Sequence, residues 1–258
     1  MKRLKASRAG HADELTVVEH LDELRTRIIV SAAVLAVAVG LCFWQNGLLL
    51  EIANGPLPGD REPITFGVTE PFLTTVKLSA YAGILLALPV ILYQAYSFIL
   101  PAFQPAEKRV VMPLLMAVPV LFIAGAVFAY FVVMPAALDF LLGFNADAFR
   151  IEIRGSEYYG FFVLTLISVG VLFQIPVGTL AITRLAIVTP EQLAANRRYA
   201  ILVIAVAAML LPGTDPVTML ISMAPLYGLF ELSLLLARRF GRPPATIGRW
   251  SAASSGPA

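Results

Sequence analysis

Apolar residues in this chain gather into long runs that contain no charged side chain. Four such runs cover residues 28–50, 78–106, 110–138 and 158–183. Each run exceeds the roughly 18 to 20 residues that an α-helix needs to cross a bilayer. The pattern therefore predicts four membrane-spanning helices, joined by segments that hold most of the charged residues.

A fifth apolar stretch, residues 199–230, is interrupted by "LLPGTDPVT" at 210–218. Two prolines, a glycine and an aspartate within nine residues end a helix. We expect two short helices joined by a tight turn, with a re-entrant hairpin as the alternative. The full prediction is an all-α membrane protein with a single domain over residues 16–239, a cytoplasmic tail over 1–15 and a disordered tail over 240–258. Its six helices are placed at about 16–50, 71–100, 108–135, 157–184, 196–211 and 216–238.

Composition and the distribution of basic residues support this topology and set its orientation. Apolar residues make up 59% of the chain and charged residues only 14%, which is typical of an integral membrane protein and not of a soluble domain. With the N-terminus inside, fifteen of the 19 lysines and arginines fall in cytoplasmic segments. The positive-inside rule then places both termini in the cytoplasm.

Several classes of function are disfavoured by what the sequence lacks. The single cysteine, Cys42, has no partner for a disulfide, and the two histidines lie outside the apolar runs. The chain contains no HExxH, GxSxG or Walker motif. We expect no cleaved signal peptide, no enzyme activity, no metal or cofactor and no nucleic-acid partner.

Charged residues just before the first apolar run form the first candidate site. Thr16 begins a capping box, so the segment "EHLDELRTRI" is predicted to be helical and to continue into the membrane. Glu23 and Arg27 are four residues apart and can form a pair along one face of this helix. Such a pair has an ordinary structural explanation, and a binding role for Glu23 is the alternative.

The first predicted cytoplasmic loop, "FILPAFQPAEKRVV", contains a second candidate carboxylate. Pro101 stiffens this loop, Phe98 provides an apolar wall, and Glu107 precedes Lys108 and Arg109. An acidic residue in a first helical turn can simply complement the helix dipole. Glu23 and Glu107, however, both lie at predicted cytoplasmic helix ends, where two carboxylates can bind two guanidinium groups.

Few polar residues lie within the predicted membrane helices. Gln174 lies nine residues before Thr183, which places it near the midplane, and Glu231 lies about one turn from the cytoplasmic end of the last helix. For Gln174 we weigh an interhelical hydrogen bond against a functional polar contact.

Four ordered motifs resemble the TatC family, the polytopic core of the twin-arginine protein translocase. They are "HLDELRTR", "EPFLTTVKL", "ALPVILYQAYSFILPAFQPAEKR" and "GAVFAYFVVMPAALDFLL", within a similarity that covers roughly residues 18–239. The resemblance implies a glove-shaped bundle of six helices, the last two short, in the cytoplasmic (inner) membrane of a prokaryote. It also implies that the chain binds the twin-arginine signal peptides of folded precursors, recruits single-span TatA- and TatB-like subunits into an oligomeric complex, and supports export driven by the proton-motive force.

Individual residues are assigned roles by matching these motifs. The resemblance implies a signal-peptide site made of Glu23, Glu107, Arg25, Arg27, Phe98, Pro101 and Arg109. It places Pro56, Glu70 and Pro71 in the outer loop and Asp215 in the last outer turn, with Gln174, Asp215 and Glu231 as partner or intramembrane polar contacts. The sequence departs from the family pattern at Gln174, where many relatives have a glutamate, and around residues 212–219.

Two other classes compete with this interpretation. A small proton- or ion-coupled secondary transporter requires buried titratable residues that face a midplane cavity, and only Gln174 lies at that depth. An intramembrane enzyme requires a nucleophile paired with a base, and the apolar runs contain no such pair. The sequence therefore favours the translocase subunit.

Overall fold

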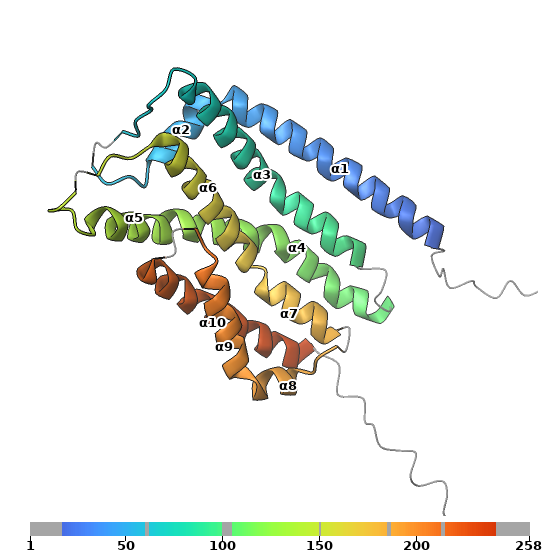
Figure 1. Cartoon of the computed structure of the whole chain (residues 1–258). Helices are drawn as coiled ribbons and strands as arrows, with labels where there is room; N and C mark the ends of the chain where they lie inside the picture. The colour runs from blue at the N-terminus through green and yellow to red at the C-terminus, as the bar shows by residue number, and fades with distance from the viewer. Residues whose placement is uncertain are drawn as a thin grey trace, which may run out of the picture.

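The computed structural model describes residues 17–59, 62–99, 105–149, 151–184, 187–212 and 215–240 (Figure 1). Within these ranges the protein is helical, and extended pairing is limited to an isolated bridge between Ile64 and Arg154. The elements are α1 (Val17–Trp44), α2 (Asn46–Asn54), α3 (Glu70–Ile99), α4 (Pro105–Phe128), the π-helix η2 (Ala129–Val133), α5 (Met134–Gly143), α6 (Gly155–Leu172), α7 (Ile175–Arg184), α8 (Pro190–Ala195), α9 (Arg197–Met209) and α10 (Pro216–Phe240). Most of the tails predicted at 1–15 and 240–258 lies outside the described residues.

Five helical segments of the described chain are long and apolar enough to span a membrane. They are Leu21–Trp44, Glu70–Phe98, Met116–Gly143, Gly155–Thr183 and Pro216–Arg239. The sixth predicted span, α9, has only 13 residues. At about 1.5 Å per residue it is roughly 20 Å long, less than the hydrocarbon thickness of about 30 Å. The expectation that the last helix is also short is wrong, because α10 has 25 residues.

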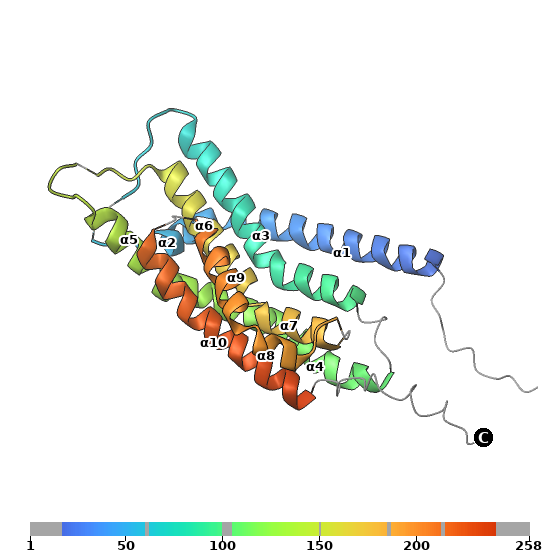
Figure 2. The same cartoon turned by 60° about the horizontal axis from the view of Figure 1, so that its bottom comes forward.

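The helices form a row of packed layers with α1 at one edge and the α9/α10 pair at the other (Figures 1 and 2). Helix α1 lies along α3, and Ala38 is the one buried residue among its described side chains, 21–44. The main core lies between α3, α5, α6, α9 and α10, where Leu78, Met134, Phe162 and Leu226 are almost fully buried.

Three predicted helices are interrupted, and each interruption has a local cause. The helix expected at 16–50 ends at Trp44 and restarts at Asn46, whose side-chain amide bonds the Phe43 carbonyl oxygen at 3.0 Å. This bond competes with regular helix formation. The helix expected at 157–184 breaks between α6 and α7, because Pro176 has no N–H for the carbonyl group four residues earlier.

The helix expected at 108–135 instead runs from Pro105 to Gly143 through a π-helical turn. Pro135 at the start of α5 cannot donate to the Phe131 carbonyl group, and the wider turn of η2 directly precedes it. Proline therefore deforms this helix without ending it. Residues 136–143, which lie beyond the helix end predicted at about 135, therefore belong to the helix.

Candidate functional site

The candidate site lies where the first turns of α1 meet the last turns of α3. Arg27 on α1 donates from Nε to the Glu23 Oε1 atom at 3.1 Å, and its Nη2 atom also donates to Oε1. On the other side, Arg27 Nη1 donates to Gln94 Oε1 at 2.9 Å, and Nη2 lies 3.4 Å from the Ser97 carbonyl oxygen. Arg27 therefore connects Glu23 to α3 through four contacts.

Helical periodicity explains why these groups face one another. Glu23 and Arg27 are separated by one turn, so both project toward α3, whereas Arg25 lies on another face and is exposed. A groove of about 520 Å³ runs beside them between α1 and α3. Phe98 and Ile91 line the groove from α3, and Arg27 and Gln94 form its polar part. The site thus combines a half-buried carboxylate with an apolar groove.

The rest of the predicted signal-peptide site is only partly described. Pro101 lies outside the described residues, and for Glu107 and Arg109 the description covers only the helical backbone in the first turns of α4. The start of α4 lies at the same end of the bundle as the start of α1 and the end of α3 in both views (Figures 1 and 2). The proximity of the Glu23 and Glu107 side chains stays a prediction.

Gln174 lies at the break between α6 and α7 and is buried, with 5% of its surface exposed. Its Nε2 atom donates to the Val118 carbonyl oxygen of α4 at 3.2 Å. Its Oε1 atom is buried without a hydrogen-bond partner. Gln174 therefore makes an interhelical hydrogen bond, as the first of the two interpretations proposed, and it retains one unused acceptor.

A polar cluster at the opposite end of the bundle connects the segment between α2 and α3 to the segment that precedes α6. Glu70, the first residue of α3, accepts hydrogen bonds from Arg154 Nε at 2.7 Å, Ser156 Oγ at 2.9 Å and the Phe66 backbone N–H at 2.8 Å. Glu70 raises the pKa of the Arg154 guanidinium, first by accepting its hydrogen bond and then by charge attraction. This contact is therefore insensitive to pH near neutrality.

The two prolines predicted for the outer loop flank the segment between α2 and α3. Pro71 follows Glu70 and is exposed, and Pro56 is half-buried just after α2. The end of α2 is held from α6 by Tyr158, whose hydroxyl donates to the Ala53 carbonyl oxygen at 2.6 Å, and by Tyr159, whose hydroxyl donates to the Asn54 side chain at 3.0 Å. These contacts fix the end of α2, from which the segment leading to α3 begins.

Asp215 and Glu231 fix the last helix at two places. Asp215 is buried and accepts hydrogen bonds from the Thr218 N–H at 2.7 Å and the Thr218 hydroxyl, so it caps the first turn of α10. Glu231 accepts from Arg197 Nε at 2.9 Å and from the Tyr227 hydroxyl at 2.8 Å. The second cluster joins α10 to the beginning of α9.

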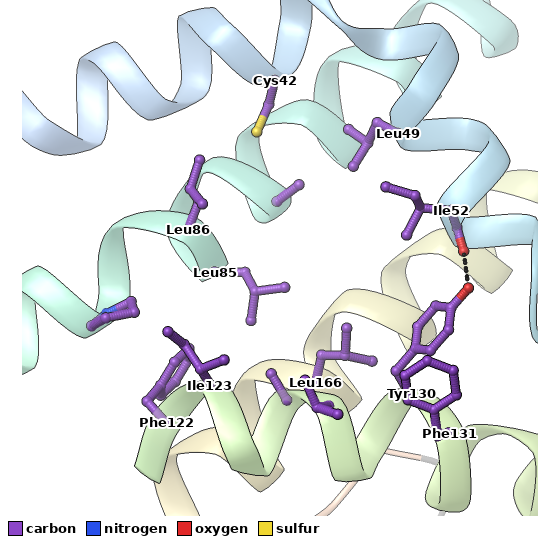
Figure 3. Close-up of a pocket in the computed structure, with 14 residues that line it drawn as sticks. Cys42, Leu49, Ile52, Leu85, Leu86, Phe122, Ile123, Tyr130, Phe131 and Leu166 are labelled. Carbon is purple, nitrogen blue, oxygen red and sulfur yellow. Dashed lines mark hydrogen bonds between the residues drawn. The ribbon is translucent and has the colours of Figure 1, made fainter. Parts of the chain in front are cut away.

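A larger apolar cavity of about 770 Å³ lies among α1, α2, α3, α4, η2 and α6 (Figure 3). Leu85 and Leu86 of α3, Phe122 of α4 and Phe131 of η2 line it. Tyr130 closes one side, where its hydroxyl donates to the Ile52 carbonyl oxygen at 3.1 Å. Among the described residues no cluster of potential metal ligands occurs, and the cavity offers almost no polar chemistry.

Sequence reasoning missed the residues that complete these clusters. Gln94 accepts a hydrogen bond from Arg27, which is 67 residues away in the sequence. Arg154 and Arg197 bind the carboxylates of Glu70 and Glu231, which are 84 and 34 residues away. No periodicity or local motif connects such positions, because each contact depends on how two separate helices pack. Gln94 does lie within one of the motifs on which the family resemblance is based.

Comparisons with known proteins agree with this architecture. Residues 19–225 match the family described as "Sec-independent protein translocase protein (TatC)". A relative of that name from Carboxydothermus hydrogenoformans is 37% identical over 87% of this chain and 93% of its own length. A chloroplastic relative from Arabidopsis thaliana is 34% identical over 89% of this chain and 68% of its own length.

The fold is also similar to that of a solved structure of the same family. The crystal structure of the "Twin Arginine Translocase Receptor- TatC in DDM" covers 87% of this chain and all of its own, with a TM-score of 0.73 and 35% sequence identity. The helical fold and its five candidate membrane spans among the described residues define a multi-pass membrane protein. The chain belongs to the TatC family of Sec-independent protein translocases. Its relatives are named as translocase components and not as enzymes.

Proposed function

We propose that this chain is the subunit of a twin-arginine translocase that binds the signal peptides of folded precursors. The observation that carries the proposal is the position of Glu23. Its carboxylate lies at a helix end beside an apolar groove, in contact with a guanidinium group of the chain itself. A site that already binds one arginine side chain has the geometry to bind another.

The chemistry of the ligand follows from the two proposed carboxylates, Glu23 and Glu107. Each can bind one guanidinium group through paired hydrogen bonds, whereas the ammonium group of lysine is a point charge. Arg25, Arg27 and Arg109 then keep this end basic, and Phe98 and Pro101 shape the surface. The site is expected to prefer Arg-Arg over Lys-Lys.

We also propose that TatA- and TatB-like single-span subunits assemble on this chain in the inner membrane of a prokaryote. Support comes from exposed apolar side chains of α9, which include Ile201, Leu202, Val203 and Val206. Asp215 and Glu231 are proposed to act indirectly, because their contacts fix α9 and α10. Gln174 is proposed to maintain the contact between α4 and α6–α7.

The proposed orientation, with both termini in the cytoplasm and six spans, can be tested by thiol labelling. In a Cys42→Ser background, a cysteine at exposed Asp147 is expected to react from outside the cell, and one at exposed Glu191 only after the membrane is opened. The physical reason is that fifteen of the 19 lysines and arginines fall in the segments proposed to be cytoplasmic. Labelling of residue 191 from outside would contradict the orientation.

Neutralising the two carboxylates tests the proposed binding site. A charge-assisted hydrogen bond contributes about 1.5 to 3 kcal/mol, and less at a hydrated interface, so Glu23→Gln or Glu107→Gln is expected to weaken signal-peptide binding about 5- to 50-fold. Glu107→Gln is expected to have the larger effect, because Arg27 already donates hydrogen bonds to the Glu23 carboxylate and competes with the peptide there. The measurement is photo-crosslinking of an Arg-Arg signal peptide and precursor export in membranes.

Two controls make this test specific. Membrane abundance must remain unchanged, and Glu51→Gln removes an exposed carboxylate from α2, outside the proposed site. The same peptide with Lys-Lys measures the preference. If the double variant Glu23→Gln/Glu107→Gln still prefers Arg-Arg as strongly as the parent chain, these carboxylates do not recognise the motif.

A further inference from the structure

We propose that Arg27 is an internal occupant of the Glu23 carboxylate, which a signal-peptide arginine displaces, and that Gln94 is the positioning residue that retains Arg27 after displacement. The proposal rests on the signal-peptide function proposed above. Gln94 then takes part in the exchange of ligands, and the Glu23–Arg27 pair on α1 competes with the signal peptide for the Glu23 carboxylate.

The Oε1 atom of Glu23 is already bound by a guanidinium group of the same helix. Arg27 directs both Nε and Nη2 at Glu23 Oε1, and this edge of the guanidinium group is one that arginine uses to bind carboxylates. A peptide arginine approaching the same oxygen meets the Arg27 side chain there. Binding through this atom is therefore an exchange of one guanidinium group for another.

Arg27 also has hydrogen-bond acceptors other than Glu23. Gln94 Oε1 accepts from Nη1 at 2.9 Å, and the Ser97 carbonyl oxygen lies 3.4 Å from Nη2. Both acceptors belong to α3, so they do not move with the first turn of α1. When a peptide takes Glu23, the Arg27 guanidinium still has hydrogen-bond partners and is not left unsatisfied at the mouth of the groove.

The contact between Arg27 and Glu23 is weak enough for a peptide arginine to replace Arg27 there. The side chains of Arg27 and Glu23 are 22% and 28% exposed and lie four residues apart on one helix. Pairs of this kind contribute little to stability. The groove of about 520 Å³ between α1 and α3 gives the Arg27 side chain space on the α3 side. Gln94 and Arg27 both line that groove, so the released group stays beside Gln94.

This arrangement makes opposite predictions for the two residues. Arg27→Gln removes the competitor and is expected to strengthen crosslinking of the Arg-Arg signal peptide about 2- to 5-fold, the scale of a single ion pair near the protein surface. Gln94→Leu removes the alternative partner, leaves Arg27 on Glu23, and is expected to weaken crosslinking by a similar factor of about 2 to 5.

The decisive measurement combines the two substitutions. If Gln94 acts only through Arg27, Gln94→Leu is expected to have no effect in the Arg27→Gln background, since there is no competitor left to hold. Damage to the packing between α1 and α3 would instead persist in both backgrounds. The assay uses the full chain in membranes with its partner subunits, and peptide crosslinking is titrated and normalised to membrane abundance.

Two further variants keep the result interpretable. Arg198→Gln removes an arginine whose guanidinium stacks on Tyr199, away from the site, and is expected to leave crosslinking unchanged. If Arg27→Gln fails to accumulate in the membrane, Arg27→Lys replaces it, because lysine cannot form the paired contact. Its expected effect has the same direction and is smaller.

The outcomes separate this inference from the function on which it rests. Weaker crosslinking in Arg27→Gln, or an equal loss from Gln94→Leu in both backgrounds, would overturn the exchange of Arg27. Glu23→Gln in the same panel reports on the proposed function. If it weakens crosslinking, the signal-peptide site stands whatever happens to Arg27. If Glu23→Gln and Glu107→Gln have no effect, the proposed function itself fails.

Discussion

Replacing Gly125 with alanine is expected to destabilise the protein by roughly 2 to 3 kcal/mol, the upper part of the range for over-packed interiors. A Cβ atom at this position of α4 would lie 2.8 Å from the Gly170 Cα atom and 2.8 Å from the Phe173 ring. Backbone atoms cannot rotate away, so α4 and α6 must separate. In a membrane, close packing at small residues is itself a main source of helix association.

The measurement for Gly125→Ala is the midpoint of thermal unfolding in detergent, followed by loss of the monodisperse peak. Gly160→Ala on α6 is the matched control, because an added Cβ there meets no atom within 4 Å. That control is expected to be neutral or slightly stabilising, since alanine favours the helix. Equal midpoints for Gly125→Ala and Gly160→Ala would show that the glycine crossing is not needed.

Gly83→Ala is expected to affect stability and signal-peptide binding together. A Cβ atom on Gly83 of α3 would lie 2.7 Å from the Val39 Cα atom and 2.8 Å from its backbone nitrogen atom. The expected loss is again about 2 kcal/mol. Because α1 carries Glu23 and α3 carries Gln94, separating these helices also disturbs the proposed site.

Binding and stability can be measured in the same preparation. Gly83→Ala is expected to lower both the unfolding midpoint and the crosslinking of an Arg-Arg signal peptide. Gly40→Ala on α1 adds a Cβ into open space and serves as its control. Normal crosslinking in a destabilised Gly83→Ala protein would contradict the view that packing of α1 on α3 positions the site.

The membrane class and the family could be inferred from the sequence because their signals are local. A run of about 20 apolar residues must span as a helix, since lipid offers the backbone no hydrogen-bond partner. The four motifs likewise identified the TatC family, which the comparisons confirm. Local reasoning failed where polar or proline residues interrupt helices, as at Asn46 and Pro176.

Proline shows the limit of such local rules. Pro176 separates α6 from α7, Pro135 follows a π-helical turn in a helix that continues, and Pro89 lies within α3. All three lack the same backbone donor. Neighbouring helices decide whether the freed carbonyl group is accommodated, so the sequence alone does not distinguish the three outcomes.

The sequence by itself determined that the chain is built from membrane-spanning helices and that Glu23 and Arg27 share one helical face. Tertiary structure alone decided that Arg27 also binds Gln94, that Glu70 binds Arg154 and that Gln174 bonds the Val118 carbonyl oxygen. The physical reason is distance along the chain. Helix formation and i,i+4 contacts depend on neighbours within a few residues, whereas these contacts require separate helices to pack in one register.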